Sequence, residues 1–348
     1  MSLLSRKSPM RIYLVTRVHG LTTHLFRPED VAGLARAADL NAFVQALLKS
    51  DYAAAVSKIP SEELNAAKLT EVFYKALADR FYFIVGITSG PVKGLFECYT
   101  RRLEVENIKR ILRAKSGAQA INEGALVPIP KEYATVNFTA MVGSKGFEEC
   151  VGLLKATIYS PLVDRLDAYN HPGGALVFEG MLDSIYYGRL WDEVEGLRDD
   201  DVRKTIGAEM DLQNLLLVLK LKSRDLPHDV IEPSLIRTHF RISDSSIDDL
   251  IRSKQDAAFD YLTRTNYAQH FLDLRNDVQK GPLSLVEHSV MASLYKHSVK
   301  TMMAKPFALV YALAYLSLCE FEERNLTAIA TGKQLGLAED KLVSVLYA

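Results

Sequence analysis

The eight histidines are the first candidates for metal binding or acid–base chemistry. No two of them have the HExxH spacing or a similar one that would place two imidazoles on one metal ion. We therefore expect no metal site built on histidine. The residues are His19, His24, His171, His228, His239, His270, His288 and His297.

Two short motifs look like catalytic signatures but lack their essential residues. The run Asp199–Asp201 could open a magnesium-binding DDxxD motif, yet Val202–Lys204 follow it, so a solvated helix start is predicted instead. Thr331–Gln334 contains Gly-Lys without the upstream glycine or the Ser/Thr of a phosphate loop. No GxGxxG or GxSxG sequence occurs. We expect no catalytic residue, metal or cofactor, and no enzyme activity.

The three cysteines, Cys98, Cys150 and Cys319, lie far apart and form no CxxC pair. Such sparse use is typical of free thiols in a reducing compartment. For Cys98 and Cys319 we expect a packing role.

Composition indicates an ordinary water-soluble protein. The chain has 348 residues, a formal net charge of −1, 48% apolar residues and 24% charged residues. This balance favours neither nucleic acid nor a membrane surface as a general partner. The longest apolar stretch, Pro306–Cys319, is shorter than the ~20 residues of a membrane span and predicts a buried helix. Met1–Arg11 is predicted to be a weakly docked tail.

The sequence repeats itself three times. Tyr52, Tyr159 and Tyr267 each end a Ser/Thr-x-Tyr segment that contains leucine, at intervals of about 108 residues. A second motif, acid-x-x-Asn followed after seven residues by Lys, recurs with about the same period. A third, weaker motif is a single glutamate that also recurs once in each copy. The second motif comprises Glu104, Asn107 and Lys115; Asp211, Asn214 and Lys222; and Glu322, Asn325 and Lys333, and the third comprises Glu71, Glu179 and Glu287.

A period of this length is too long for one short solenoid repeat and suits a small domain with its own core. We therefore predict an all-α fold of three similar helical-bundle domains related by a pseudo-threefold axis. Their bounds are residues 10–117, 118–225 and 226–348.

Apolar periodicity places most of the helices. Residues 30–52 predict one amphipathic helix or two short ones, Ser245 with Asp248 predicts a capping box, and Arg80–Val85 is assigned to a helix despite its strand-like composition. Further helices are predicted over residues 69–87, 178–191 and 285–303, and loops over residues 89–91, 171–174 and 226–227.

On a helix, the acid, Asn and Lys of the second motif share one face, beside an apolar stripe. One interpretation is structural: the Asn bridges backbone groups, and the acid and Lys pair within their own unit. The other is functional: the three faces grip a partner. The candidate partner-binding residues are the nine motif residues and Arg113; copies one and two carry extra cations such as Arg113 and Lys220, whereas Thr331 stands at the matching place in copy three.

Two further hypotheses follow from the repeats. If the charged faces bind a partner, reversing Lys115 and Lys222 to Glu weakens binding and leaves the thermal melt nearly unchanged. The recurring tyrosines are predicted to be core or corner residues, so that each Tyr→Ala change destabilises by about 3–5 kcal/mol.

Three segments also resemble one known family, formed by the C subunits of archaeal and bacterial A/V-type ATPases, whose counterpart in eukaryotic vacuolar ATPases is the d subunit. They are Glu209–Leu215, Tyr186–Leu190 and Glu322–Lys333, and the last is similar to that family's acid-x-x-Asn-Leu-x-x-Ile-x-x-Gly-Lys signature. The resemblance covers nearly the whole chain.

The resemblance implies a funnel-like arrangement of three helical domains around a cavity. It implies a non-catalytic central-stalk adapter, one copy per complex, that links the shaft subunits to the membrane proteolipid ring and transmits torque for ATP synthesis or for proton or sodium transport. Its place would be peripheral, at the cytoplasmic face of the membrane, without nucleic acid or a membrane span of its own. Two alternatives stay open: a metal-dependent all-α enzyme, and a helical scaffold unrelated to ATPases.

Overall fold

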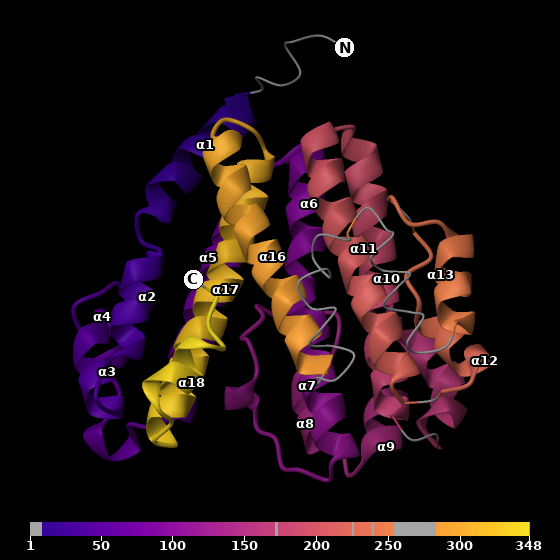
Figure 1. Cartoon of the computed structure of the whole chain (residues 1–348), viewed down its shortest axis with the longest axis horizontal. Helices are drawn as coiled ribbons and strands as arrows, with labels where there is room; N and C mark the ends of the chain where they lie inside the picture. Colours follow the sequence, from indigo (N-terminus) through magenta and orange to yellow (C-terminus); the bar gives the residue numbers. More distant parts are fainter. Residues whose placement is uncertain are drawn as a thin grey trace. The chain divides into compact units, whose positions relative to one another are not determined.

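Every regular element in the described part of the chain is helical, as predicted. The structure, a computed structural model, describes residues 9–170, 173–224, 226–238, 240–253, 267 and 283–347. Figure 1 shows the helices coloured in chain order. The contacts between residues divide the chain into two compact units. Unit 1 comprises Met1–Ser89, Gly124–Ile129 and Tyr295–Ala348, and unit 2 comprises Gly90–Glu123 and Pro130–Leu294. The predicted division into three domains stays a prediction.

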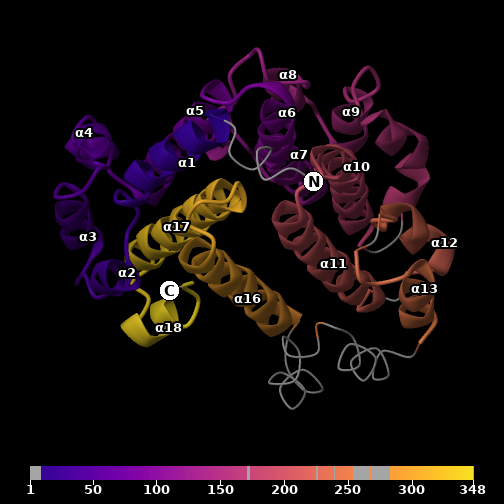
Figure 2. The ribbon, with the colours of Figure 1, turned by 90° about the horizontal axis from the view of Figure 1, so that it is seen from above.

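Unit 1 combines helices from both ends of this sequence. They are α1 (Pro9–Thr22), α2 (Pro28–Ala35), α3 (Leu40–Leu47), α4 (Ala53–Val56), η2 (Ser61–Glu63), α5 (Ala66–Gly86), α17 (Val310–Gln334) and α18 (Glu339–Val343), with η3 (Glu123–Ala125) at the division and α16 (Leu283–Ala304) crossing it. Helix α17 packs against α1, α2, α3, α5 and α18, and Figure 2 shows α5 and α1 along one side of it and α18 on another.

The core of unit 1 explains this arrangement. Leu326 and Ile329, the apolar stripe of the third motif copy, are fully buried in a cluster with Phe43, Leu47 and Phe73. The stripe of a helix near residue 326 is therefore covered by helices from the first quarter of the sequence, because that is where the matching apolar faces lie.

Unit 2 is built around α10, which packs against α6, α7 and α11. The corresponding stripes of the first two motif copies, Ile108 with Ile111 and Leu215 with Val218, are also buried. The elements are α6 (Gly90–Thr100), α7 (Arg102–Ser116), α8 (Phe138–Gly143), α9 (Phe147–Gly152), η4 (Ser160–Asn170), α10 (Gly174–Leu197), α11 (Asp200–Lys222), α12 (His228–Ile231), η5 (Glu232–Ser234) and α13 (Asp244–Arg252).

Short polar side chains fix several helix starts. Asn65 caps α5 by accepting a hydrogen bond from the amide of Lys68 at 3.0 Å, and Asp199 caps α11 in the same way, which confirms the acidic run as a helix start. The predicted capping box at Ser245 was wrong: Ser243, two residues earlier, caps α13 by accepting from the amide of Ser246.

Other boundaries differ from the predictions for local reasons. Gly90 and Pro91 open α6 rather than forming a loop, because Gly90 adopts a φ of 59° that turns the chain directly into the helix. The buried helix predicted from Pro306 begins at Val310, and helix α1 begins at Pro9, inside the predicted tail. Residues 1–8, 171, 172, 239, 261–266 and 270 lie outside the described residues, and with them the rest of that tail, His171, His239 and His270.

The remaining helix predictions are confirmed. Residues 30–52 contain the two short helices α2 and α3, and Arg80–Val85 belong to α5. No helix in the described ranges combines the length and the apolarity that crossing a bilayer requires.

Candidate functional site

The motif acids form the centres of three similar clusters, which we call corners. The first corner comprises Glu104, Thr135 and Tyr159; the second comprises Asp211, Phe240, Arg241 and Tyr267; the composite corner comprises Glu322, Phe26 and Tyr52. In each, a buried carboxylate on a long helix accepts a tyrosine hydroxyl and at least one backbone amide. The first two corners lie in unit 2 and the composite corner in unit 1.

The distances agree closely between corners. Tyr159 donates its hydroxyl to Glu104 over 2.9 Å, Tyr267 to Asp211 over 2.7 Å and Tyr52 to Glu322 over 2.8 Å. The three carboxylate residues are 2%, 3% and 5% exposed, respectively. Hydrogen bonds to charged groups are about twice as strong as neutral ones, and they are what makes a buried carboxylate tolerable.

A backbone amide also donates a hydrogen bond to each carboxylate. Thr135 donates its amide to Glu104 at 2.7 Å, Arg241 donates to Asp211 at 2.8 Å and Phe26 donates to Glu322 at 2.7 Å. Each acid therefore binds a segment that is distant from its helix in the sequence, and holds that segment against the helix.

The tyrosines of the three corners are core residues, as predicted. Tyr52, Tyr159 and Tyr267 are 5%, 0% and 3% exposed. Burial first, and then the negative charge of the partner acid, raises the pKa of each phenol above its usual value. The hydroxyls therefore remain protonated donors at neutral pH.

Each corner joins two different copies of the repeat. Glu104 of copy one binds the tyrosine of copy two, and Asp211 of copy two binds the tyrosine of copy three, 55 and 56 residues away. Glu322 of copy three closes the series by binding Tyr52 of copy one, 270 residues away.

The motif asparagines are buried and act on backbone. The side-chain amide of Asn214 donates to the carbonyl oxygen of Ile236 and accepts from its amide, both at 3.0 Å. Asn325 makes the same pair of bonds to Tyr347, at 2.7 and 2.8 Å. Asn107 is fully buried. An amide that satisfies both backbone groups of one residue holds an extended segment against the helix without leaving a buried polar atom unpaired.

Two motif lysines cap the ends of short helices. The ammonium of Lys115 donates to the carbonyl oxygens of Val142 and Ser144 at the end of α8. That of Lys222 donates to Ile251 and Ser253 at the end of α13. A cation placed at the carbonyl end of a helix is stabilised by the helix dipole.

These contacts match the structural interpretation of the motif. Because Lys115 and Lys222 hold carbonyls within unit 2, the structure leads us to expect that reversing their charge lowers the melt, unlike the nearly unchanged melt that the functional hypothesis required. Lys333 differs from them: within the described residues its side chain has no hydrogen bond or ion pair. The role of all ten candidates in partner binding stays a prediction.

Arg113, the tenth candidate, and Lys220 make equivalent ion pairs. Arg113 on α7 forms a two-pronged contact with Glu179 on α10, both bonds at 2.7 Å, and Lys220 on α11 reaches Glu287 on α16 at 2.8 Å. The glutamates are the third repeated element of the sequence. Glu71 instead pairs with Lys68 of its own helix at 3.1 Å, and Thr331 stands at the place of the cation in copy three.

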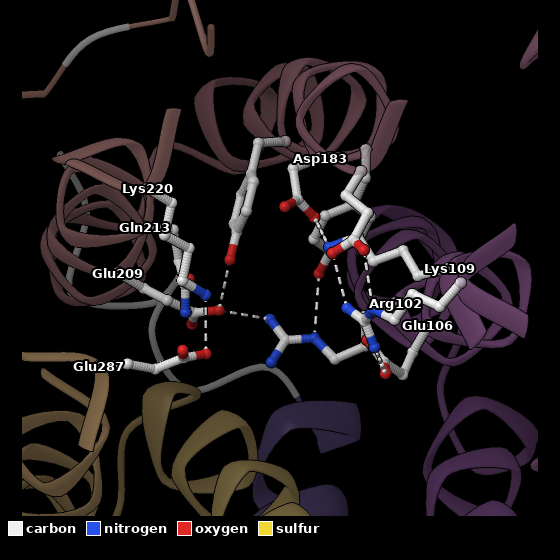
Figure 3. A network of polar contacts seen from close by, with 12 residues as sticks. Arg102, Glu106, Lys109, Asp183, Glu209, Gln213, Lys220 and Glu287 are labelled. Atoms are coloured by element: carbon white, nitrogen blue, oxygen red, sulfur yellow. Dashed lines mark hydrogen bonds and ion pairs between the residues drawn. The ribbon is translucent and has the colours of Figure 1, made fainter. Parts of the chain in front are cut away.

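A polar network centred on Arg102 was not predicted (Figure 3). Its guanidinium donates to Glu209 at 2.8 Å and to the hydroxyl of Tyr186 at 3.1 Å, and lies 3.7 Å from the ring centre of Tyr99. Tyr187 also donates to Glu209, at 2.9 Å. The network ties α7, α10 and α11 together.

The sequence contained a weak indication of this network. Arg102, Glu209 and Glu320 each lie two residues before a motif acid, so extending the repeat comparison upstream would have singled out charged residues at that place. Close by, Lys109 pairs with Asp183 across α7 and α10 (Figure 3).

The Gly-Lys pair of the third copy has a packing explanation. A Cβ atom on Gly332 would lie 2.2 Å from the Cδ2 atom of Leu342 in α18, so a larger residue here would force the buried side chain of Leu342 to move. Within the described residues, no group of three or more histidine, cysteine or acidic side chains is arranged to hold a metal ion.

Comparisons with known proteins give one consistent result. Residues 14–344 match the family described as ATP synthase (C/AC39) subunit. The chain is similar to archaeal proteins that are named as the C subunit of A-type ATP synthase. The one from Methanocaldococcus jannaschii is 24% identical over 96% of this chain and 85% of its own length, and the one from Methanosarcina mazei is 25% identical over 94% and 90%. The one from Pyrococcus furiosus is 25% identical over 91% and 85%.

Proposed function

This chain belongs to the ATP synthase (C/AC39) subunit family, and we propose that it is the non-catalytic central-stalk adapter of a rotary A/V-type ATPase. The observation that carries the proposal is the match over residues 14–344, together with relatives of one name that align with more than nine-tenths of the chain.

In this role the chain joins the shaft subunits to the membrane proteolipid ring, one copy per complex, at the cytoplasmic face. It carries torque between them while ATP is made or ions are pumped, and it performs no chemistry itself. We also propose that the helical units follow the predicted pseudo-threefold, funnel-like arrangement.

The internal construction of the units suits torque transmission. An adapter that twists under load stores energy instead of passing it on, so its helices must resist sliding past one another. Buried carboxylates that bind backbone amides, and ion pairs such as Arg113 with Glu179, fix the helices in register.

A reconstitution experiment tests this role. ATP-hydrolysing head and shaft are combined with vesicles that contain the ring, with and without the purified chain. We expect ATP-driven ion uptake only when the chain is present, and hydrolysis by the head in both cases. Equal ion uptake without the chain would refute the adapter role.

Lys333 offers the cleanest test of the proposed partner-binding residues. It carries charge on the motif face, but its side chain has no polar contact within the described residues, so Lys333→Glu is expected to weaken shaft or ring binding without lowering the melt. Lys333→Gln is the matched control for size. Unchanged binding by Lys333→Glu would remove this residue from the proposed interface.

A further inference from the structure

The composite corner differs from the second corner first of all in the segment it holds, which is not continuous. In the second corner, Asn214 binds Ile236 and Asp211 binds the amide of Arg241, so both bind one stretch of six residues. In the composite corner, Asn325 binds Tyr347 while Glu322 binds Phe26, which lies 296 residues away in the sequence.

The two separate segments meet on the same core. Phe26 and Leu346, the neighbour of Tyr347, both pack against the cluster that contains Phe43. The ring centres of Tyr347 and of Phe321 on α17 are 5.1 Å apart. In the composite corner two separate segments thus bind the motif acid and asparagine, whereas in the second corner one continuous segment binds both.

Two ties found at the other corners are missing here. Lys115 and Lys222 cap α8 and α13, whereas the side chain of Lys333 makes no such contact within the described residues. Thr331 occupies the place of Arg113 and Lys220, so the matching link from α17 to Glu71 is absent from this part of the structure as well.

Opening this corner also leaves no buried charge without a partner. The guanidinium of Arg80, on α5, donates to Glu322 at 2.6 Å, and α5 stays packed along α17. If Phe26 withdraws, Glu322 keeps this ion pair and the hydroxyl of Tyr52, so the largest cost of breaking a buried carboxylate site does not arise.

We propose that the composite corner is a conformational release point of unit 1: the segments at Phe26 and Tyr347 detach from α17 and rebind while the first and second corners stay closed. A continuous segment must break both its contacts together, whereas two separate segments can leave one at a time. Local opening of this kind occurs at free energies well below that of global unfolding. It exposes the polar face of α17 around Glu322 and Asn325.

Native-state hydrogen exchange of the full chain, resolved by residue, tests the proposal directly. The amides of Phe26 and Tyr347 are expected to have protection factors at least about tenfold lower than those of Thr135, Ile236 and Arg241, although all five donate to a motif side chain. Equal protection at the five amides would overturn the proposal.

Asn325→Ala and Asn214→Ala form a matched pair, because both remove the same two backbone bonds. Asn325→Ala is expected to speed exchange at least about tenfold at Tyr347 and its neighbours, and less than about twofold along α5. Asn214→Ala is expected to speed exchange throughout α11 and α13. If Asn325→Ala instead speeds exchange throughout unit 1, the corner is an ordinary part of the core and the proposal fails.

Discussion

The hydrogen bond between Tyr159 and Glu104 allows a quantitative test of the first corner. Tyr159→Phe removes one donor from a carboxylate that is 2% exposed, and leaves the ring in place. A hydrogen bond to a charged group contributes about 1.5–3 kcal/mol to stability. Glu104 retains the amide and hydroxyl of Thr135 at 2.7 and 2.6 Å and the guanidinium of Arg101 at 3.5 Å. We therefore expect the low end, about 1.5 kcal/mol.

Tyr159→Ala removes the ring as well. The side chain is fully buried, and truncating a large buried aromatic residue costs about 3–5 kcal/mol. The two substitutions together separate the hydroxyl's contribution from that of packing.

Trp191 makes the assay specific for unit 2. It is the single tryptophan of the sequence, lies in α10 and is 9% exposed, so its fluorescence in a urea titration follows the unfolding of the unit that contains Tyr159. Tyr13→Phe is the matched control, because Tyr13 is 51% exposed and belongs to unit 1. We expect its effect to stay within about 0.5 kcal/mol.

An equal shift of the free energy of unfolding by Tyr159→Phe and by the Tyr13→Phe control would show that the Tyr159 hydroxyl does not stabilise the corner. That result would mean that water or another donor already satisfies Glu104, and that the tyrosines recur in the repeat for their rings alone.

Three further predictions use the same fluorescence assay. Lys222→Glu places a carboxylate against the carbonyl oxygens of Ile251 and Ser253 and should lower stability by about 1–3 kcal/mol, whereas Lys204→Glu on the exposed face of α11 should not; equal effects would contradict the capping role. Arg102→Ala removes the main partner of the half-buried Glu209, so it should lower the free energy of unfolding more than the double variant Arg102→Ala/Glu209→Gln does. If the effects of the two single substitutions simply add in the double variant, the two side chains are not coupled. Burial raises the pKa of Tyr159, Tyr186 and Tyr187 in the folded chain, so above about pH 10 the phenols of the unfolded chain lose their protons first. The free energy of unfolding should therefore fall by about 1.4 kcal/mol per phenol and pH unit. A urea midpoint unchanged between about pH 9 and pH 11 would count against this.

The helical class and the buried stripes were predictable from the sequence because they follow from periodicity alone. An apolar pair at a fixed distance from the motif, such as Ile108 with Ile111, has to face a core wherever the helix packs. The burial of Tyr159 was predictable for a similar reason, since a large aromatic residue repeated beside leucines rarely faces water.

The partners of the motif residues were not predictable, for a physical reason. Glu104 and Glu322 bind the backbone amides of Thr135 and Phe26, and any residue except proline offers such a donor, so these positions carry no common residue type. Likewise, Lys115 binds carbonyl oxygens, which every residue has. A helical wheel places the acid and Lys on one face but gives no means of telling a solvent-facing surface from one covered by a short helix.

The pairing of the acid of one copy with the tyrosine of another was also not predictable from the sequence. A repeat in sequence suggests units that each contain their own contacts, yet Glu322 binds Tyr52 from the opposite end of the described chain. Only the fold decides whether a helix packs on the segment before it or after it.

The measurement that tests the central claim most directly is native mass spectrometry of the tagged protein, purified from detergent-solubilised membranes of its source. The proposed adapter role predicts one copy of the chain in a complex with shaft subunits and the proteolipid ring. Recovery of the chain as a lone monomer, from an extract in which the intact ATPase is present, would contradict it.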